Sequence, residues 1–209
     1  MSKENLVFLP GWTKKSGDYR ELLALLGQKY QVYPLDLLDD ARIYDLADFA
    51  QKVRNFLEKE KIKKTILVGH SFGGRVAIKL ALSNPELVSR LILINSAGIE
   101  RKSLLIKAIK AIKPIKLEFF RNIFGSKDYL AAKGNLRKTL VNIVEENLEP
   151  ELAKIKTPTL IIWGRDDHTT PLWIGELIHK LIKNSILKII DGDHGIPYRK
   201  PEEVFDAIK

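Results

Sequence analysis

The residue of this chain best suited to chemistry is Ser71, which has glycine two positions before it and two positions after it. Residues 69–74 read Gly-His-Ser-Phe-Gly-Gly, after a strand-like apolar run at 65–68 and before a helical pattern at 75–82. Glycine at these places lets neighbouring backbone approach a sharp strand-to-helix turn, and such a turn exposes the serine hydroxyl. The pattern indicates a serine that can act as a nucleophile.

An acid and a histidine follow Ser71 along the chain. A strand pattern at residues 159–163 runs into Gly-Arg-Asp-Asp-His-Thr-Thr-Pro at 164–171, and a strand pattern at 186–190 runs into His194. Catalytic groups of open α/β sheets lie at the carboxyl ends of the strands. A serine, an acid and a histidine at three such ends can therefore meet although they are far apart in sequence.

These three residue types suit acyl transfer. A histidine, with an ordinary pKa of about 6.5, can take the proton of a serine hydroxyl as the serine attacks a carbonyl group. An aspartate on the far side of the ring holds the tautomer and stabilises the imidazolium. His194 is the candidate base, and from spacing alone both Asp166 and Asp167 can be the acid. The predicted reaction is acyl transfer to water through an acyl-enzyme.

Together these segments resemble the α/β-hydrolase superfamily over nearly the whole chain except its middle. The similarity is carried by residues 8–12, 69–74, 163–171 and 194–203. In that family the acid loop often reads Gly, two residues, Asp, three residues, Pro. The resemblance therefore implies Asp167 as the catalytic acid, with Asp166 as the alternative.

The resemblance also implies an oxyanion hole made by the backbone N–H groups of Trp12 and Phe72. Family members usually have His-Gly after the first strand, whereas this chain has Pro10 in place of that histidine. Proline lacks its own N–H but leaves that of Trp12 available. We expect an intact hole, and the motif leaves open which side chains support it.

Strand and helix patterns alternate along the chain and predict an α/β fold. The strand candidates are residues 5–9, 30–35, 65–69, 90–95, 159–163 and 186–190. Nearly all-apolar strands that alternate with helices predict a mostly parallel sheet with both faces covered. The resemblance implies a doubly wound sheet with the order 2-1-3-4-5-6.

The segment between the fourth and fifth strands, residues 99–156, is much longer than an ordinary connection. The resemblance implies a helical lid there, inserted into a core made of residues 1–98 and 157–209. In the family such a lid lies over the nucleophile and sets substrate choice. Candidates for an apolar acyl pocket, with core packing as the alternative, are Trp12, Phe119, Phe120 and Phe124.

Much of the positive charge of the chain lies in the predicted lid. Residues 99–156 hold 13 Lys and Arg against 7 Asp and Glu, while the whole chain has a net charge of +9. We interpret these lysines as solvated, with contact to an anionic membrane surface as the alternative. The high pI of about 9.5 is not joined to a nucleic-acid-binding module, so no nucleic-acid partner is predicted.

The other histidines are assigned no catalytic role. His70 is expected to pack beside the nucleophile, His168 follows the acid directly, and His179 lies on a predicted helix at residues 172–183. A metal site made by the aspartates around His168 and His194 is the alternative, but neither segment has a known ligand spacing and the serine turn would be unexplained. We expect no metal and no cofactor.

Composition bounds the remaining possibilities. A chain of 209 residues with 45% hydrophobic and 29% charged residues is typical of a globular protein. It has no cysteine, no apolar run long enough to span a membrane, and a first apolar strand that is too short for the apolar core of a signal peptide, so a cytoplasmic location is predicted. The oligomeric state is not indicated.

The main hypothesis from the sequence is a serine hydrolase that cleaves a carboxylic ester of a small molecule. The same residues also serve thioesters, lactones, amides and carbon–carbon bonds, because the triad does not select the bond. A non-catalytic α/β-hydrolase scaffold that binds a small ligand is the alternative from a different class.

Overall fold

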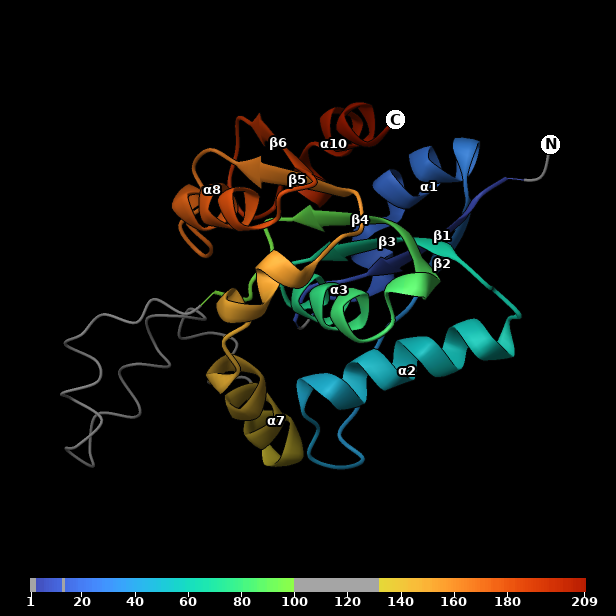
Figure 1. Ribbon diagram of the computed structural model, residues 1–209, viewed down its shortest axis with the longest axis vertical. Coiled ribbons are helices and arrows are strands. Elements are labelled where there is room, and N and C mark those ends of the chain that lie inside the picture. The colour runs from blue at the N-terminus through green and yellow to red at the C-terminus, as the bar shows by residue number, and fades with distance from the viewer. Residues whose placement is uncertain (1–2, 13, 100–131) are drawn as a thin grey trace, which may run out of the picture.

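The computed structural model describes residues 3–12, 14–99 and 132–209, and its centre is one sheet of six strands (Figure 1). The strands are β1 (Asn5–Leu9), β2 (Gln31–Pro34), β3 (Thr65–His70), β4 (Val88–Ile94), β5 (Thr159–Gly164) and β6 (Ser185–Ile190). All neighbouring strands are parallel, and their order is β2-β1-β3-β4-β5-β6. The predicted α/β fold and strand order are confirmed.

Helices cover both faces of the sheet. They are α1 (Arg20–Lys29), α2 (Leu46–Lys59), α3 (Phe72–Ser83), α7 (Gly134–Glu145), α8 (Leu172–Leu181), α9 (Ile196–Arg199) and α10 (Pro201–Ile208). Short 3-10 turns lie at η1 (Ser16–Tyr19), η2 (Pro85–Leu87) and η4 (Glu149–Lys154). Figure 1 shows α1 and α10 on one side of the sheet and α2 and α3 on the other.

The strands read as continuous apolar runs because the sheet is buried on both faces. Every residue of β3 and of β5 is buried. Successive side chains of a strand point to opposite faces, and the core is accordingly divided in two. Leu67 packs with the residues of α2, α3 and α8, whereas Ile66 and Val68 pack with those of α1 and α10.

Local sequence explains where α2 begins. The Asp45 side chain accepts a hydrogen bond from the Asp48 N–H at 2.8 Å, and the Asp48 side chain accepts one from the Asp45 N–H at 3.0 Å. This reciprocal cap satisfies two N–H groups that would otherwise lack a partner at the helix start. The apolar face of α2 buries Phe49 and Val53 in the core.

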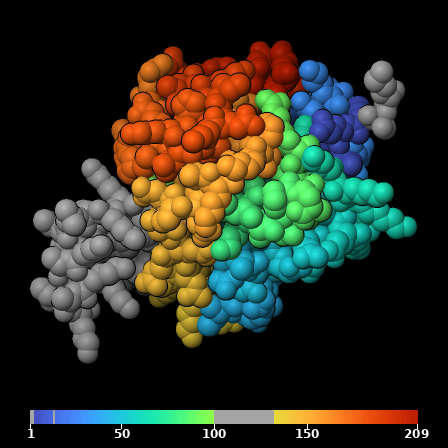
Figure 2. Space-filling model, in the orientation of Figure 1, coloured from blue at the N-terminus to red at the C-terminus, as the bar shows by residue number. Residues whose placement is uncertain are grey.

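The part of the predicted lid that the structure describes packs onto this core. Helix α7 lies beside the segment that precedes α2, gold beside blue in Figure 2. Across this contact the Tyr44 N–H donates to the Thr139 hydroxyl at 3.0 Å, and the Leu136 N–H donates to the Asp40 carboxylate at 2.9 Å. Residues 100–131 lie outside the described residues, so the division into core and lid stays a prediction.

Predicted element boundaries differ slightly from those observed. Strand β4 begins at Val88 rather than at residue 90, and α8 ends at Leu181 rather than at residue 183. The C-cap Ile182 is extended, and its N–H still bonds to the Ile178 carbonyl at 2.9 Å. Such differences at element ends are ordinary because helix and strand ends are decided by local packing.

Candidate active site

Ser71 lies in a tight turn between β3 and α3. Its backbone has φ +52° and ψ −114°, and its N–H donates to the Ile94 carbonyl of the neighbouring strand at 3.1 Å. A non-glycine residue with positive φ is uncommon and costs about 1–3 kcal/mol, and it persists only where the surrounding structure imposes it. The strain at Ser71 is therefore a property of the turn itself.

The glycines around Ser71 are required by close backbone approach. A Cβ at Gly69 would lie 2.4 Å from the Gly73 carbonyl oxygen, and a Cβ at Gly73 would lie 2.2 Å from the Leu9 carbonyl oxygen. Real Cβ atoms do not come this near to backbone oxygen, so both positions exclude a side chain unless the backbone shifts. The two glycines of the motif therefore stand at the two positions where another stretch of backbone passes too close for a side chain.

His194 lies between Ser71 and Asp167. Its Nε2 atom is 2.9 Å from the Ser71 Oγ, and its Nδ1 atom is 2.7 Å from the Asp167 Oδ2. A carboxylate only accepts, so Nδ1 carries the proton toward Asp167, and the Nε2 of the neutral ring is left to accept the Ser71 proton. The structure thus brings together the three side chains that the sequence predicted would meet.

Asp167 is the carboxylate directed at His194, while Asp166 is exposed. The Asp167 Oδ1 accepts hydrogen bonds from the N–H groups of Thr169 and Thr170, both at 2.8 Å, and its side chain is fully buried. The Thr170 Oγ1 lies 2.8 Å from the Asp167 Oδ2. These contacts fix the direction of the carboxylate.

Asn95 ties the acid loop to the histidine loop. It lies directly after β4, is fully buried and has φ +43°, a left-handed conformation that asparagine tolerates. Its Oδ1 accepts the Gly164 N–H at 2.7 Å, and its Nδ2 donates to the Asp193 carbonyl at 3.1 Å. The Asn95 carbonyl is also 3.1 Å from the Thr170 hydroxyl. One side chain therefore holds the ends of β5 and β6 together.

His70 connects the histidine loop to the loop after β1. Its Nε2 is 2.9 Å from the His194 carbonyl oxygen, and its Nδ1 is 2.7 Å from the Tyr19 hydroxyl. A carbonyl only accepts, so His70 carries its proton on Nε2, and Tyr19 donates to Nδ1. The Tyr19 oxygen in turn accepts the Gly11 N–H at 3.0 Å. This chain links the loops of Trp12 and His194.

Both members of this link are neutral. Burial, and after it the neighbouring His194, holds the pKa of His70 well below its usual value. Burial also raises the pKa of the Tyr19 hydroxyl. The two hydrogen bonds therefore persist without an ionised group over the range in which a histidine base works.

The two predicted oxyanion-hole residues lie next to each other. Phe72 is the first residue of α3, so its N–H is one of the helix-start donors that lack a partner within the helix. The Trp12 ring stands edge-on to the Phe72 ring, with centroids 5.3 Å apart. A Cβ on Gly11 would be 3.4 Å from the Ser71 Cβ, which places the loop of Trp12 directly beside the nucleophile.

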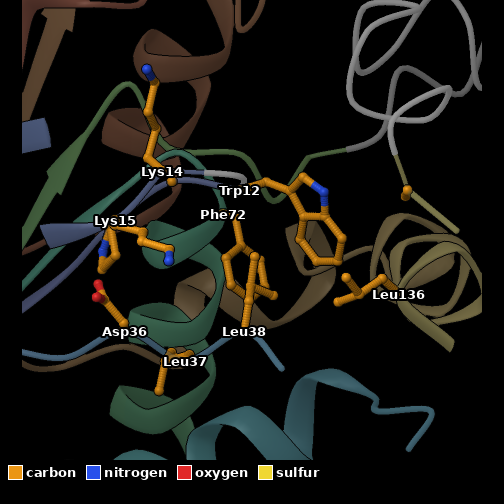
Figure 3. Close-up of a pocket in the computed structure, with 11 residues that line it drawn as sticks. Trp12, Lys14, Lys15, Asp36, Leu37, Leu38, Phe72 and Leu136 are labelled. Carbon is orange, nitrogen blue, oxygen red and sulfur yellow. The ribbon is translucent and has the colours of Figure 1, made fainter. Parts of the chain in front are cut away.

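A pocket of about 230 Å³ lies next to these two residues. Its lining residues, several of which Figure 3 labels, are Pro10, Gly11, Trp12, Lys14, Lys15, Asp36, Leu37, Leu38, Phe72, Ala132 and Leu136. Trp12 is therefore a pocket residue. The other three predicted pocket residues, Phe119, Phe120 and Phe124, lie outside the described residues.

Other predicted groups lie apart from this arrangement. His168 and His179 are exposed, and the His179 ring is 2.9 Å from the Ser185 hydroxyl. Asp191 pairs with Arg165. Among the residues that the structure describes, no group of three or more His, Asp or Glu could hold a metal ion.

Three residues of the arrangement were not singled out from the sequence: Tyr19, Asn95 and Thr170. Asn95 carried a usable signal, because it is a polar residue directly after an apolar strand, at the edge where ligands and catalytic groups lie. Thr170 lies in the recognised acid loop. No local sequence signal pointed to Tyr19, because its contact with His70 joins residues that are 51 positions apart.

The chain belongs to the α/β-hydrolase family. The family model, described as the alpha/beta hydrolase family, matches residues 6–207. This match covers β1 from Leu6 onward, the other five strands, and the segments of Ser71, Asp167 and His194.

Individual relatives are similar to this chain at low identity. The uncharacterized hydrolase YugF of Bacillus subtilis (strain 168) is 28% identical over 99% of this chain and 89% of its own length. The pimeloyl-[acyl-carrier protein] methyl ester esterase of Nitrosomonas europaea is 26% identical over 98% of this chain and 95% of its own. The solved enol-lactonase from Burkholderia xenovorans LB400 has a TM-score of 0.81 at 17% identity, over 100% of this chain and 90% of that one, and this likeness concerns the fold alone.

None of the helices within residues 3–12, 14–99 and 132–209 has both the length and the apolar character needed to cross a membrane.

Proposed function

We propose that this protein is a serine hydrolase that cleaves a carboxylic ester through an acyl-enzyme intermediate. The observation that carries the proposal is the relay from the Ser71 Oγ to the His194 Nε2 at 2.9 Å and from the His194 Nδ1 to the Asp167 Oδ2 at 2.7 Å. Both distances lie within hydrogen-bonding range, and each partner has the residue type that its role requires.

In the first step the Ser71 oxygen attacks the ester carbonyl carbon while its proton passes to the His194 Nε2. Asp167 stabilises the imidazolium and does not itself take the proton. The carbonyl oxygen becomes negative and accepts hydrogen bonds from the N–H groups of Trp12 and Phe72. Removal of one such donor from a protease costs about 10² to 10³ in kcat, so these amides would supply a large part of the rate.

Collapse of the tetrahedral intermediate breaks the bond between the carbonyl carbon and the alcohol oxygen. His194 returns its proton to that oxygen, the alcohol leaves, and the acyl group stays on Ser71. A water molecule then gives a proton to His194 and attacks the acyl carbon, and the same steps release the carboxylic acid. Atoms and charge balance without a cofactor.

The choice of an ester is supported by a relative. The Nitrosomonas europaea protein, 26% identical over nearly the full length of both chains, is named a methyl ester esterase. Another relative, a 2-hydroxy-6-oxononadienedioate/2-hydroxy-6-oxononatrienedioate hydrolase of a Pseudomonas species, is 24% identical over 79% of this chain. Since one fold serves different bonds, thioesters, amides and carbon–carbon bonds are the competing substrates for the same residues.

A serine-directed fluorophosphonate probe tests the proposal. We expect the wild-type protein to be labelled and Ser71→Ala to lose the label, because only an activated serine attacks the phosphonate. Ser83→Ala, at the exposed end of α3, is the matched control and should be labelled like the wild type. A folded wild-type protein that takes no label would contradict the proposal and favour a non-catalytic binding protein.

A further inference from the structure

The pocket beside the proposed oxyanion hole lies on one side of the nucleophile. Its described lining comes from the loops after β1 and β2, from the start of α3, and from the first turn of α7 together with Ala132, which precedes that helix. No lining residue comes from the loops after β5 and β6, which carry Asp167 and His194. Since β1 and β5 lie on opposite sides of β3 in the sheet, the pocket and His194 lie on opposite sides of Ser71.

This placement determines whether the pocket binds the acyl group or the alcohol group of an ester. His194 must reach the alcohol oxygen to give it a proton, so the leaving alcohol lies on the His194 side. The acyl group is then directed away from His194, toward Trp12 and Phe72. The pocket is therefore an acyl pocket.

The size and walls of the pocket limit the acyl group. A volume of about 230 Å³ holds about eight non-hydrogen atoms, at roughly 30 Å³ for each water-sized group. The walls around Trp12, Phe72 and Leu136 are apolar. They fit a short unbranched chain of methylene groups better than a polar substrate, because apolar surface is removed from water on binding.

Of the two lysines in the described pocket lining, one makes an ion pair and the other makes none with the described residues. The Lys14 ammonium lies 4.0 Å from the Asp18 carboxylate and 5.0 Å from the Tyr198 ring centre. Lys15 makes no side-chain ion pair within the described residues. In Figure 3 its side chain extends in the direction of Phe72, whereas Lys14 extends away.

The one acidic residue in the described pocket lining, Asp36, is hydrogen-bonded to Ser16. The Asp36 carboxylate accepts hydrogen bonds from the Ser16 N–H at 2.7 Å and from the Ser16 hydroxyl at 3.2 Å. It therefore braces the loop next to Lys15, and among the described contacts it forms no ion pair with the Lys15 ammonium. An apolar slot with an unpaired ammonium group at its edge is complementary to a chain that ends in a negative charge.

From this arrangement we propose that the acyl group of the substrate ends in a carboxylate, so that the substrate is a monoester of a medium-length dicarboxylic acid. Lys15 binds the free carboxylate, and the apolar walls take the methylene groups between the two ends. This inference rests on the proposed esterase function and specifies the substrate class of the same site.

The test compares two p-nitrophenyl esters of equal length. One is the adipic acid monoester with a free carboxylate, and the other has a terminal primary amide in place of that carboxylate. We expect wild-type kcat/KM to favour the carboxylate ester about fivefold, the upper range for a solvent-exposed ion pair. In Lys15→Gln the preference should vanish. Near 1 M salt it should also fall, because the screening length there is about 3 Å.

Two further variants separate Lys15 from a general effect of charge. Lys29→Gln, at the exposed end of α1, removes the same charge outside the pocket and should keep the preference. Lys14→Gln should keep it too, because the Lys14 ammonium lies beside Asp18 and the Tyr198 ring and, in Figure 3, is directed away from Phe72. Loss of the preference in either variant but not in Lys15→Gln would overturn the assignment to Lys15.

The outcomes also separate this inference from the proposed function. Equal hydrolysis of both esters by the wild-type protein would overturn the recognition of a terminal carboxylate and leave the esterase proposal standing. Failure to hydrolyse either ester, together with absence of fluorophosphonate labelling, would overturn both.

Discussion

At the scale of single residues, the proposed acid illustrates how adjacent identical residues take different positions. Asp167 is buried and receives two backbone N–H bonds in addition to the His194 ring, whereas Asp166 is exposed. The two side chains are chemically the same. They differ in the direction that the loop gives each side chain: that of Asp167 is directed at His194, and that of Asp166 is exposed.

We predict that Asp167→Asn lowers kcat by up to about 10⁴, as neutralising a triad aspartate does in a serine protease, because the amide favours the wrong histidine tautomer. Asp166→Asn is the matched control and should change kcat little. Steady-state hydrolysis of a p-nitrophenyl ester measures both. The reverse pattern would assign the role to Asp166.

A second prediction at this scale concerns the link from Gly11 through Tyr19 to His70. Tyr19→Phe keeps the ring packed against Phe8 but removes the hydroxyl that bonds both partners. We expect kcat to fall about tenfold with KM nearly unchanged, which corresponds to one lost buried hydrogen bond. The reason is that the loop of Trp12 and the loop of His194 lose their common support.

The control for Tyr19→Phe is Tyr30→Phe, at a partly buried tyrosine that follows α1. It makes the same chemical change away from Ser71 and should leave kcat unaltered. Urea unfolding of both variants gives the stability comparison. A Tyr19→Phe protein with wild-type kcat would show that the link acts on stability alone.

At the scale of elements, the turn at Ser71 depends on two backbones in close contact. We predict that Gly73→Ala lowers the free energy of unfolding by about 1–3 kcal/mol or more, because the new Cβ would lie 2.2 Å from the Leu9 carbonyl oxygen. Activity should fall as well, since the shift is transmitted to Ser71. Urea denaturation and the ester assay measure the two effects.

The matched control is Gly27→Ala in α1, where a Cβ would meet nothing within 4 Å. This change should raise the free energy of unfolding by about 0.5–1 kcal/mol, since alanine suits a helix interior better than glycine. If Gly73→Ala were as well tolerated as Gly27→Ala, the close approach of β1 to α3 would not constrain the turn.

At the scale of the whole molecule, the buried neutral His70 makes stability depend on pH. Its pKa is lowered in the folded state by burial and by His194, so between that lowered value and about 6.5 the unfolded chain binds a proton that the folded chain does not. Stability is therefore present above about pH 6.5 and is lost as the pH falls below it, by at most about 1.4 kcal/mol per pH unit from this group.

His70→Gln tests this dependence. Glutamine does not titrate, and its amide N–H can still donate to the His194 carbonyl. We expect the urea midpoint of the wild-type protein to fall between pH 6.5 and 5 and that of His70→Gln to fall less. Parallel pH profiles for the two proteins would show that His70 does not contribute.

Much of this architecture was predictable because it follows from short-range patterns. The apolar runs of β3 and β5 require burial on both faces, and that requirement predicts a covered parallel sheet. The glycines around Ser71 predict a turn with no room for side chains. The resemblance to α/β-hydrolases added the strand order, which no local pattern contains.

The covered parallel sheet, the turn at Ser71 and the order of the candidate catalytic residues could be predicted from the amino-acid sequence, because they follow from local apolar periodicity, glycine spacing and motif order. The fold shows that Asp167, which the resemblance already implied, is the carboxylate that meets His194. That Tyr19 and Asn95 support the loops on either side of Ser71 is visible in the folded chain alone. The physical reason is that these contacts join residues far apart in the chain. Which side chains meet is fixed by the packing of strand ends, and that packing has no signature in the neighbouring residues.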